Sequence, residues 1–293
     1  MRTLSKLALM MFTLASFECY ALDYQTPAKT KEDKLWSNEG SKVLCKLTQN
    51  IEGWGDVTYF MEANKKTRLE LLLTPYREFD KVSTVTLYDT PPNWFPGKAE
   101  RKLNEAKLFR GFDGYLNGTD AWYTLSALEK GHMVVFSYHD SSYSEDEIRV
   151  LLNPFSIKTP FKDFINCTKE LLDYGYQDIR FTVIHFEDKT NKLTPFSSKR
   201  LEQIANYILE DKNFSEISVT VHTDTFGDKE ENQKVTDEQA KVIKDFFISK
   251  GVDENKLFIK SMGQEDPAVD NLNNDKSLIN RRVLIQIVDE NNR

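Results

Sequence analysis

The sequence predicts two domains: a mainly antiparallel β domain in the N-terminal half and an α/β sandwich at the C-terminus. The first half contains short β-prone segments separated by turn residues, a pattern typical of a sandwich or a small barrel. The last part alternates strands of period two with amphipathic helices in the order βαβαβ and ends on a further strand. A length of 293 residues also suits two domains better than one.

The first residues have the features of a secretory signal peptide. Arg2 and Lys6 form a short basic lead, and the apolar stretch 7–17 that follows is too short to span a membrane stably. We expect residues 1–21 to be cleaved and the mature protein to be exported to the periplasm. Cys19 is not expected to carry a lipid, because the residues before it are not the small ones of a lipoprotein signal. No other apolar run approaches the ~20 residues that a membrane helix needs.

Two cysteines, Cys45 and Cys167, remain in the mature chain. In an oxidising compartment they predict one disulfide, and two separate buried thiols are the alternative. Because the bridge would close a long loop, chain entropy assigns it about 4–5 kcal/mol at most.

The predicted N-terminal domain comprises residues 22–175. Its β-prone segments are 57–62, 67–73, 82–88, 105–109, 121–128, 133–138 and 148–152. A helix is predicted over 161–172, where Thr159-Pro160 provides the start and apolar residues recur near one face.

The predicted C-terminal domain comprises residues 176–293. Its strands are expected at 179–186, 217–221, 257–262 and 283–288. Ser197 or Ser198 is expected to cap a first helix whose apolar residues recur at helical spacing. Thr236 with Gln239 has the spacing of a capping box, which predicts a second helix over 236–250. Right-handed crossovers would leave one sheet backed by helices on one side.

The composition and motifs argue against several classes of function. A net charge of −7 leaves no basic footprint, so neither nucleic acid nor an anionic membrane surface is an expected partner. The sequence contains no His-Glu-x-x-His or Gly-x-Ser-x-Gly pattern. His132 and His139 would lie on opposite faces of a strand, which argues against a shared metal. We therefore expect a protein without catalytic residues, metal or cofactor.

Polar residues gather where the predicted strands of the C-terminal domain end. The strand 217–221 leads into His222-Thr223-Asp224, which brings a carboxylate to the open end of a sheet, where ligands of α/β folds bind. After it come, in order, Asn232, Val235-Thr236-x-x-Gln239-Ala240 and Asn280-Arg281-Arg282-Val283. Over residues 179–289 this succession resembles the OmpA-like peptidoglycan-binding family.

The resemblance implies non-covalent binding of the diaminopimelate in the peptidoglycan stem peptide. Diaminopimelate carries an ammonium and a carboxylate at its distal centre, and Asp224 is expected to pair with the ammonium. The arginine that takes the carboxylate in the family is replaced here by Gln239, which carries no charge. The expected binding residues are Thr223, Asp224, Asn232, Thr236, Gln239 and Arg281.

The replacement of that arginine leaves three possibilities open. In the first, Arg281 or Lys189 supplies the missing cation. In the second, wall binding is weak for a single copy and gains from assembly at many copies. In the third, the fold is a scaffold that no longer holds the wall.

The layout of the whole chain resembles the MotY family of sodium-driven polar flagellar motors. In that family a cleaved signal is followed by a β-rich N-terminal domain and then by a C-terminal OmpA-like domain. One long disulfide is also part of this layout. The resemblance implies a place in the motor T ring, at the flagellar basal body. The N-terminal domain would contact the basal body and a MotX-like ring partner, and the stator complex would be an indirect partner. A structural tether of the OmpA type without a motor role is the alternative.

The segment 91–97 is the predicted partner contact of the N-terminal domain. Prolines stiffen it, so that little entropy is lost on binding. It carries Trp94 and Phe95, and tryptophan is a favoured interface anchor. The alternative is a loop that tucks Trp94 into the fold.

Overall fold

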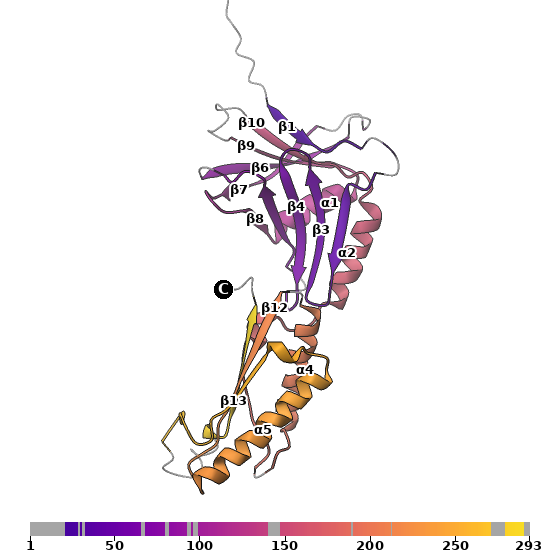
Figure 1. Cartoon of the computed structure of the whole chain (residues 1–293). Coiled ribbons are helices and arrows are strands. Elements are labelled where there is room, and N and C mark those ends of the chain that lie inside the picture. The colour runs from indigo at the N-terminus through magenta and orange to yellow at the C-terminus, as the bar shows by residue number, and fades with distance from the viewer. Residues whose placement is uncertain are drawn as a thin grey trace, which may run out of the picture.

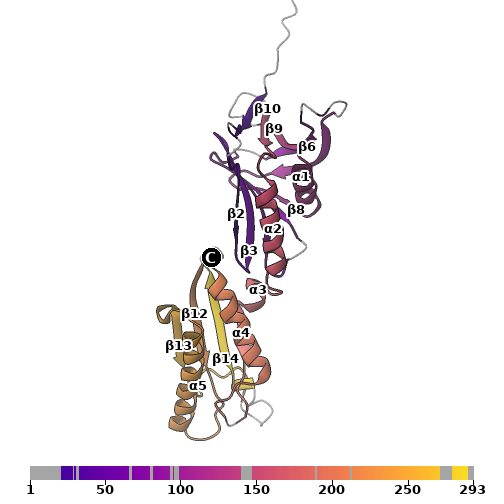
Figure 2. The same cartoon turned by 90° about the vertical axis from the view of Figure 1, so that its right-hand side faces the viewer.

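The computed structural model describes residues 21–28, 30, 33–65, 68–79, 82–92, 95, 99–139, 147–188, 190–211, 213–270 and 279–289. Trp94, Lys189 and, apart from Ala21, the predicted signal peptide lie outside these residues. Two lobes lie end to end, an N-terminal one made largely of strands and a C-terminal one in which two long helices run beside a sheet (Figures 1 and 2). Within the described part of the chain, no helix combines the length and the apolar character required to cross a membrane.

Two five-stranded sheets form the N-terminal lobe, and they confirm the mainly antiparallel domain. All their strand pairs are antiparallel except β1 with β10. In order across the first sheet lie β1 (Leu22–Gln25), β10 (Glu147–Leu152), β9 (Met133–His139), β6 (Ser83–Thr90) and β7 (Arg101–Leu108). In order across the second lie β2 (Trp36–Gly40), β3 (Leu44–Ile51), β4 (Gly55–Glu62), β5 (Glu70–Pro75) and β8 (Gly114–Asn117). Strands β1, β2, β3 and β8 have no counterpart among the predicted segments.

Both sheets contribute to one hydrophobic core. Val57 and Tyr59 occupy alternate, buried positions of β4, as the period of a strand requires. They belong to the same buried cluster as Val85 of β6 and Phe136 of β9. The lobe is therefore two sheets around one apolar interior.

The strand predicted over 121–128 is wrong, because this segment forms helix α1 (Thr119–Glu129). Ala121, Leu125 and Leu128 are four and three residues apart, so a helix places all three on one face. All three are buried in the core of the lobe. Burial of residues at helical spacing on one face thus identifies a helix rather than a strand.

The predicted disulfide between Cys45 and Cys167 is present and joins β3 to helix α2 (Lys158–Glu170), the helix predicted at 161–172. The two cysteines are 122 residues apart in the sequence. Gly40 of β2 lies against the bridge, and a Cβ atom there would come within 2.5 Å of Cys167 Sγ. The absence of a side chain at Gly40 therefore lets the strand approach the bridge.

One four-stranded sheet with the order β11-β14-β12-β13 forms the C-terminal lobe. The last strand, β14 (Val283–Asp289), lies between β11 (Phe181–Ile184) and β12 (Phe214–Val221) and is antiparallel to both. Strand β13 (Leu257–Ser261) is parallel to β12. The connections contain α3 (Tyr176–Ile179), α4 (Pro195–Glu210), α5 (Lys229–Ser249) and the short helix η2 (Glu254–Lys256). Buried residues of α4 and α5 share a core with the sheet, which confirms the α/β domain.

Both long helices begin earlier than predicted. Thr194 caps α4 by accepting a hydrogen bond from the Ser197 backbone, so the predicted caps Ser197 and Ser198 lie inside the first turn. Asp228 caps α5, and Thr236 lies about two turns inside that helix rather than at its start. The predicted capping box at Thr236 is therefore wrong.

The two lobes meet at the open end of the β3–β4 hairpin, where β3 begins and β4 ends. Val43 and Ala63, which flank the hairpin, are buried in the core of the C-terminal lobe. The Leu172 backbone N–H donates to Lys42 O at 2.8 Å, and the Asn64 N–H donates to Leu172 O at 3.0 Å. Apolar burial and backbone hydrogen bonds together fix the N-terminal lobe to one end of the C-terminal lobe.

Candidate functional site

A cleft of about 1110 Å³ opens at the carboxyl end of β12. This end is the tip of the C-terminal lobe that points away from the N-terminal lobe (Figures 1 and 2). Five of the six predicted binding residues line the cleft: Thr223, Asp224, Asn232, Gln239 and Arg281. The sixth, Thr236, is fully buried and does not line it.

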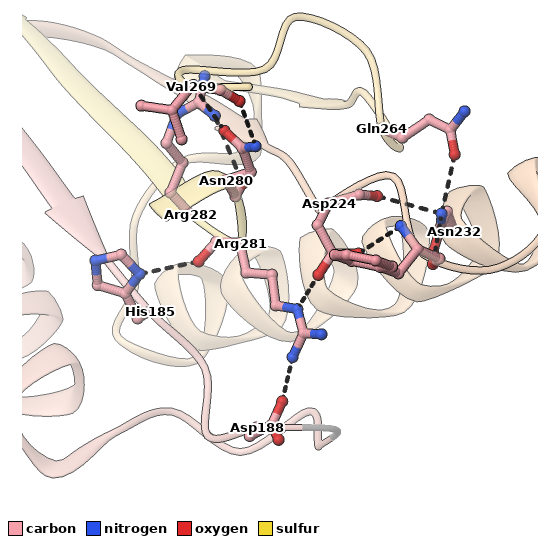
Figure 3. Close-up of polar contacts among 10 residues, drawn as sticks. His185, Asp188, Asp224, Asn232, Gln264, Val269, Asn280, Arg281 and Arg282 are labelled. Carbon is pink, nitrogen blue, oxygen red and sulfur yellow. Dashed lines mark hydrogen bonds and ion pairs between the residues drawn. The ribbon is translucent and has the colours of Figure 1, made fainter. Parts of the chain in front are cut away.

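Asp224 is the buried anion of the cleft, with 3% of its side chain exposed. The backbone before it is fixed, because the Thr223 N–H donates to Gly263 O at 2.8 Å. Its Oδ1 accepts a hydrogen bond from the Phe226 N–H at 2.9 Å, and its Oδ2 accepts one from Arg281 Nε (Figure 3). A buried charge is tolerated here because it is both paired and hydrogen-bonded.

Arg281 lies between two carboxylates. Its Nε donates to Asp224 and its Nη1 donates to Asp188 (Figure 3). Burial lowers the pKa of Arg281, but the hydrogen bonds and charges of Asp224 and Asp188 outweigh burial and the pKa is raised. Of the two predicted sources of a cation, Arg281 lies in the cleft, and Lys189 lies outside the described residues. Asp224, expected to pair with an ammonium of the ligand, thus already has a cationic partner within the chain.

Asn232 and Thr236 hold the loops around the carboxylate. Asn232 Nδ2 donates to the carbonyl oxygens of Asp224 and Phe226, both at 3.2 Å, and to Gln264 Oε1 at 3.0 Å. Thr236 Oγ1 accepts from the Gly263 N–H at 3.1 Å. Helix α5 therefore positions the two loops that frame Asp224, and Thr236 acts from inside the fold.

Two contacts of the β11–α4 loop complete the cleft, and the predicted site did not include them. Asp188 reaches Arg281, and Asn191 Nδ2 donates to Glu238 of α5 at 2.7 Å. The sequence carries one signal for them, since the resemblance to the OmpA-like family departs at Glu187-Asp188-Lys189. Gln239 of α5 lines the same cleft and offers a neutral amide.

Comparison with known proteins decides the family. Residues 24–173 match the MotY N-terminal domain family, and residues 185–281 match the OmpA family. The sodium-type flagellar protein MotY of Vibrio parahaemolyticus is 32% identical over 281 residues, which cover 94% of this chain and 95% of that one. The chain belongs to the MotY family.

Two further matches cover a smaller share of this MotY family member. The outer-membrane lipoprotein YfiB of Pseudomonas aeruginosa is 28% identical over 116 residues, which cover 40% of this chain and 68% of that one. The crystal structure of the C-terminal domain of Helicobacter pylori MotB is 24% identical and covers 38% of this chain and 87% of that one, with a TM-score of 0.34.

His222 of this MotY family member makes folding sensitive to acid. Burial lowers the pKa of His222 below its ordinary 6.5, and the backbone hydrogen bond to Glu265 only partly opposes this effect. The unfolded chain therefore takes up a proton below pH 6.5 that the folded chain resists, and stability falls as the pH decreases through that range. We expect His222→Gln to flatten the pH dependence of the urea midpoint between about pH 6.5 and 5. An unchanged slope in the variant would contradict this role of His222.

The predicted partner loop is described only in part. Phe95 is 48% exposed, and its ring centroid lies 6.4 Å from that of His132. His132 Nδ1 is 2.6 Å from Asp89 Oδ1, so this histidine belongs to a local polar pair.

Among the described residues, no group of three potential ligands could hold a metal ion.

Proposed function

We propose that the chain is a non-enzymatic periplasmic component of the flagellar motor T ring. It anchors the basal body to peptidoglycan through the C-terminal cleft and supports the incorporation of stator units for sodium-driven motility. The observation that carries this proposal is a polar cleft around Asp224 and Arg281 in an OmpA-family domain, joined in one chain to a MotY N-terminal domain.

The charges of the cleft are complementary to the distal centre of diaminopimelate. A carboxylate has about four lone-pair sites, and the described contacts of Asp224 use two of them. The guanidinium of Arg281 has five N–H donors, and its described contacts with other side chains use two. The ligand ammonium would bind Asp224 and the ligand carboxylate would bind Arg281, in place of the family arginine that Gln239 replaces.

The position of the cleft suits a mechanical anchor. The cleft opens at the tip of the C-terminal lobe, and the N-terminal lobe is attached at the opposite end (Figures 1 and 2). One end of the molecule can thus hold the wall while the other contacts the basal body and a MotX-like ring partner. Many copies in a ring would add their individual affinities for the wall.

Co-sedimentation of the full chain with purified sacculi tests the wall contact. We expect the protein to sediment with sacculi, and a free diaminopimelate-containing stem peptide to release it. The same peptide with lysine in place of diaminopimelate lacks the distal carboxylate and should release less. Protein that remains in the supernatant, or that liberates soluble muropeptides, contradicts a non-enzymatic anchor.

A deletion strain separates the motor role from its alternative, a structural tether of the OmpA type. Loss of swimming, together with basal bodies that lack the ring, is expected if the chain belongs to the motor. Normal swimming with a weakened cell envelope would favour the tether.

Gln239→Arg is expected to strengthen wall binding. The change restores a charge at the position where the OmpA-like family has its arginine, and a charge-assisted hydrogen bond contributes about 1.5–3 kcal/mol against ~1 for a neutral one. Sacculus affinity should therefore increase roughly tenfold. Gln286→Arg adds the same charge on an exposed position of β14 outside the cleft and serves as the control. Equal gains in sacculus affinity for both variants would show that the added positive charge acts by non-specific electrostatic attraction and not through the cleft.

A further inference from the structure

Asp188 contacts Arg281 from the β11–α4 loop, whereas Asp224 contacts it from the end of β12. Asp188 lies on the turn between β11 and α4, where the Glu187 N–H donates to Lys192 O at 2.7 Å. The bond from Asn191 to Glu238 of α5, at 2.7 Å, keeps this turn beside the cleft. The Asp188 carboxylate is thereby held against the Nη1 end of Arg281, as Figure 3 shows.

The two carboxylates on Arg281 differ in how easily they leave it. The side chain of Asp224 is 3% exposed, and separation from Arg281 would strand a buried charge. The side chain of Asp188 is 58% exposed and can turn into water at little cost. An incoming anion would therefore replace Asp188 more readily than Asp224.

We propose that Asp188 is a built-in competitor that occupies on Arg281 the place of the ligand carboxylate. The inference rests on the proposed wall binding and concerns the same cleft. A stem peptide binds by exchanging Asp188 for its own distal carboxylate, while its ammonium joins Asp224. Asp188 lowers the affinity of each copy for diaminopimelate, and it has no such effect on a ligand that carries an ammonium alone.

The exchange predicts a small and selective gain when Asp188 loses its charge. An exposed ion pair is typically worth about 0.2–1 kcal/mol, so Asp188→Asn should raise affinity for sacculi and for a diaminopimelate-containing stem peptide by about 1.4- to fivefold. Affinity for the lysine-containing peptide should not increase, because this ligand has no distal carboxylate to take the place of Asp188. A purely structural role of Asp188 would alter both affinities alike or neither.

Glu187→Gln provides the matched control. It removes the same charge from the same turn, but the partner of Glu187 is Lys192, at 3.2 Å, rather than Arg281. Calorimetric titration of the full-length variants with both peptides should show the gain for Asp188→Asn and no gain for Glu187→Gln.

The outcomes separate this inference from the proposed function. If the wild type binds the diaminopimelate peptide and Asp188→Asn binds it equally or more weakly, the competitor role is overturned and wall binding stands. Tighter binding of the diaminopimelate peptide by Asp188→Asn, and not by Glu187→Gln, supports the role of Asp188 as a competitor. If neither protein binds the peptide or sacculi, both proposals fail.

Discussion

Replacement of Cys45 and Cys167 by serine is expected to lower the free energy of unfolding by about 2–5 kcal/mol. The bridge spans 122 residues, and a long closed loop removes much of the entropy of the unfolded chain. It also fixes α2 to β3, and both elements lead to the junction between the lobes. We therefore expect α2 and the junction to open first in the variant.

Urea unfolding with and without a thiol reductant measures this effect. The wild type should lose stability when reduced, and the double serine variant should not respond to the reductant. Gly40→Ala is an independent check, because its Cβ would come within 2.5 Å of Cys167 Sγ and should hinder the bridge. Coincident unfolding curves of oxidised and reduced wild type would contradict a stabilising bridge.

Replacement of Asp224 is expected to remove wall binding. A hydrogen bond to a charged group contributes about 1.5–3 kcal/mol, so loss of the carboxylate should weaken the binding of a ligand ammonium about tenfold or more. Asp224→Ala also deprives the partly buried Arg281 of its buried anionic partner and should destabilise the C-terminal lobe. Asp224→Asn keeps the shape and an oxygen for the Phe226 N–H while it removes the charge.

The comparison between the two Asp224 variants separates binding from folding. Asp224→Asn should fold with a smaller loss of stability than Asp224→Ala and still fail to sediment with sacculi. Asp245→Asn is the matched control, because Asp245 is exposed, pairs with Lys241 and does not line the cleft. Recovery of Asp224→Asn with sacculi at the level of Asp245→Asn would exclude Asp224 from the binding site.

Strand β3 illustrates what the residue pattern could not predict in the N-terminal lobe. Its buried positions include Gln49, a polar residue that interrupts the alternation of apolar and polar side chains. Gln49 is accommodated because its amide donates to Asn153 O and accepts from Asn153 N, both at 2.9 Å. A contact between residues so distant in the chain leaves no periodic signal in the sequence.

The candidate site was predictable where its residues follow a strand end directly. Thr223 and Asp224 follow β12, and their place at the open end of the sheet follows from the strand alone. The ion pairs of Arg281 were not predictable, since they depend on side chains from three separate segments. Thr236 is predicted to contact the ligand, but its hydroxyl lies inside α5 and forms hydrogen bonds with the backbone.

A crystal structure of the full chain with a bound diaminopimelate-containing stem peptide tests the central claim most directly. The distal ammonium should lie within hydrogen-bond distance of Asp224, and the distal carboxylate should contact Arg281 in the place of Asp188. A peptide bound outside the cleft, or a cleft that remains empty at concentrations that saturate binding in solution, would contradict wall anchoring through this site.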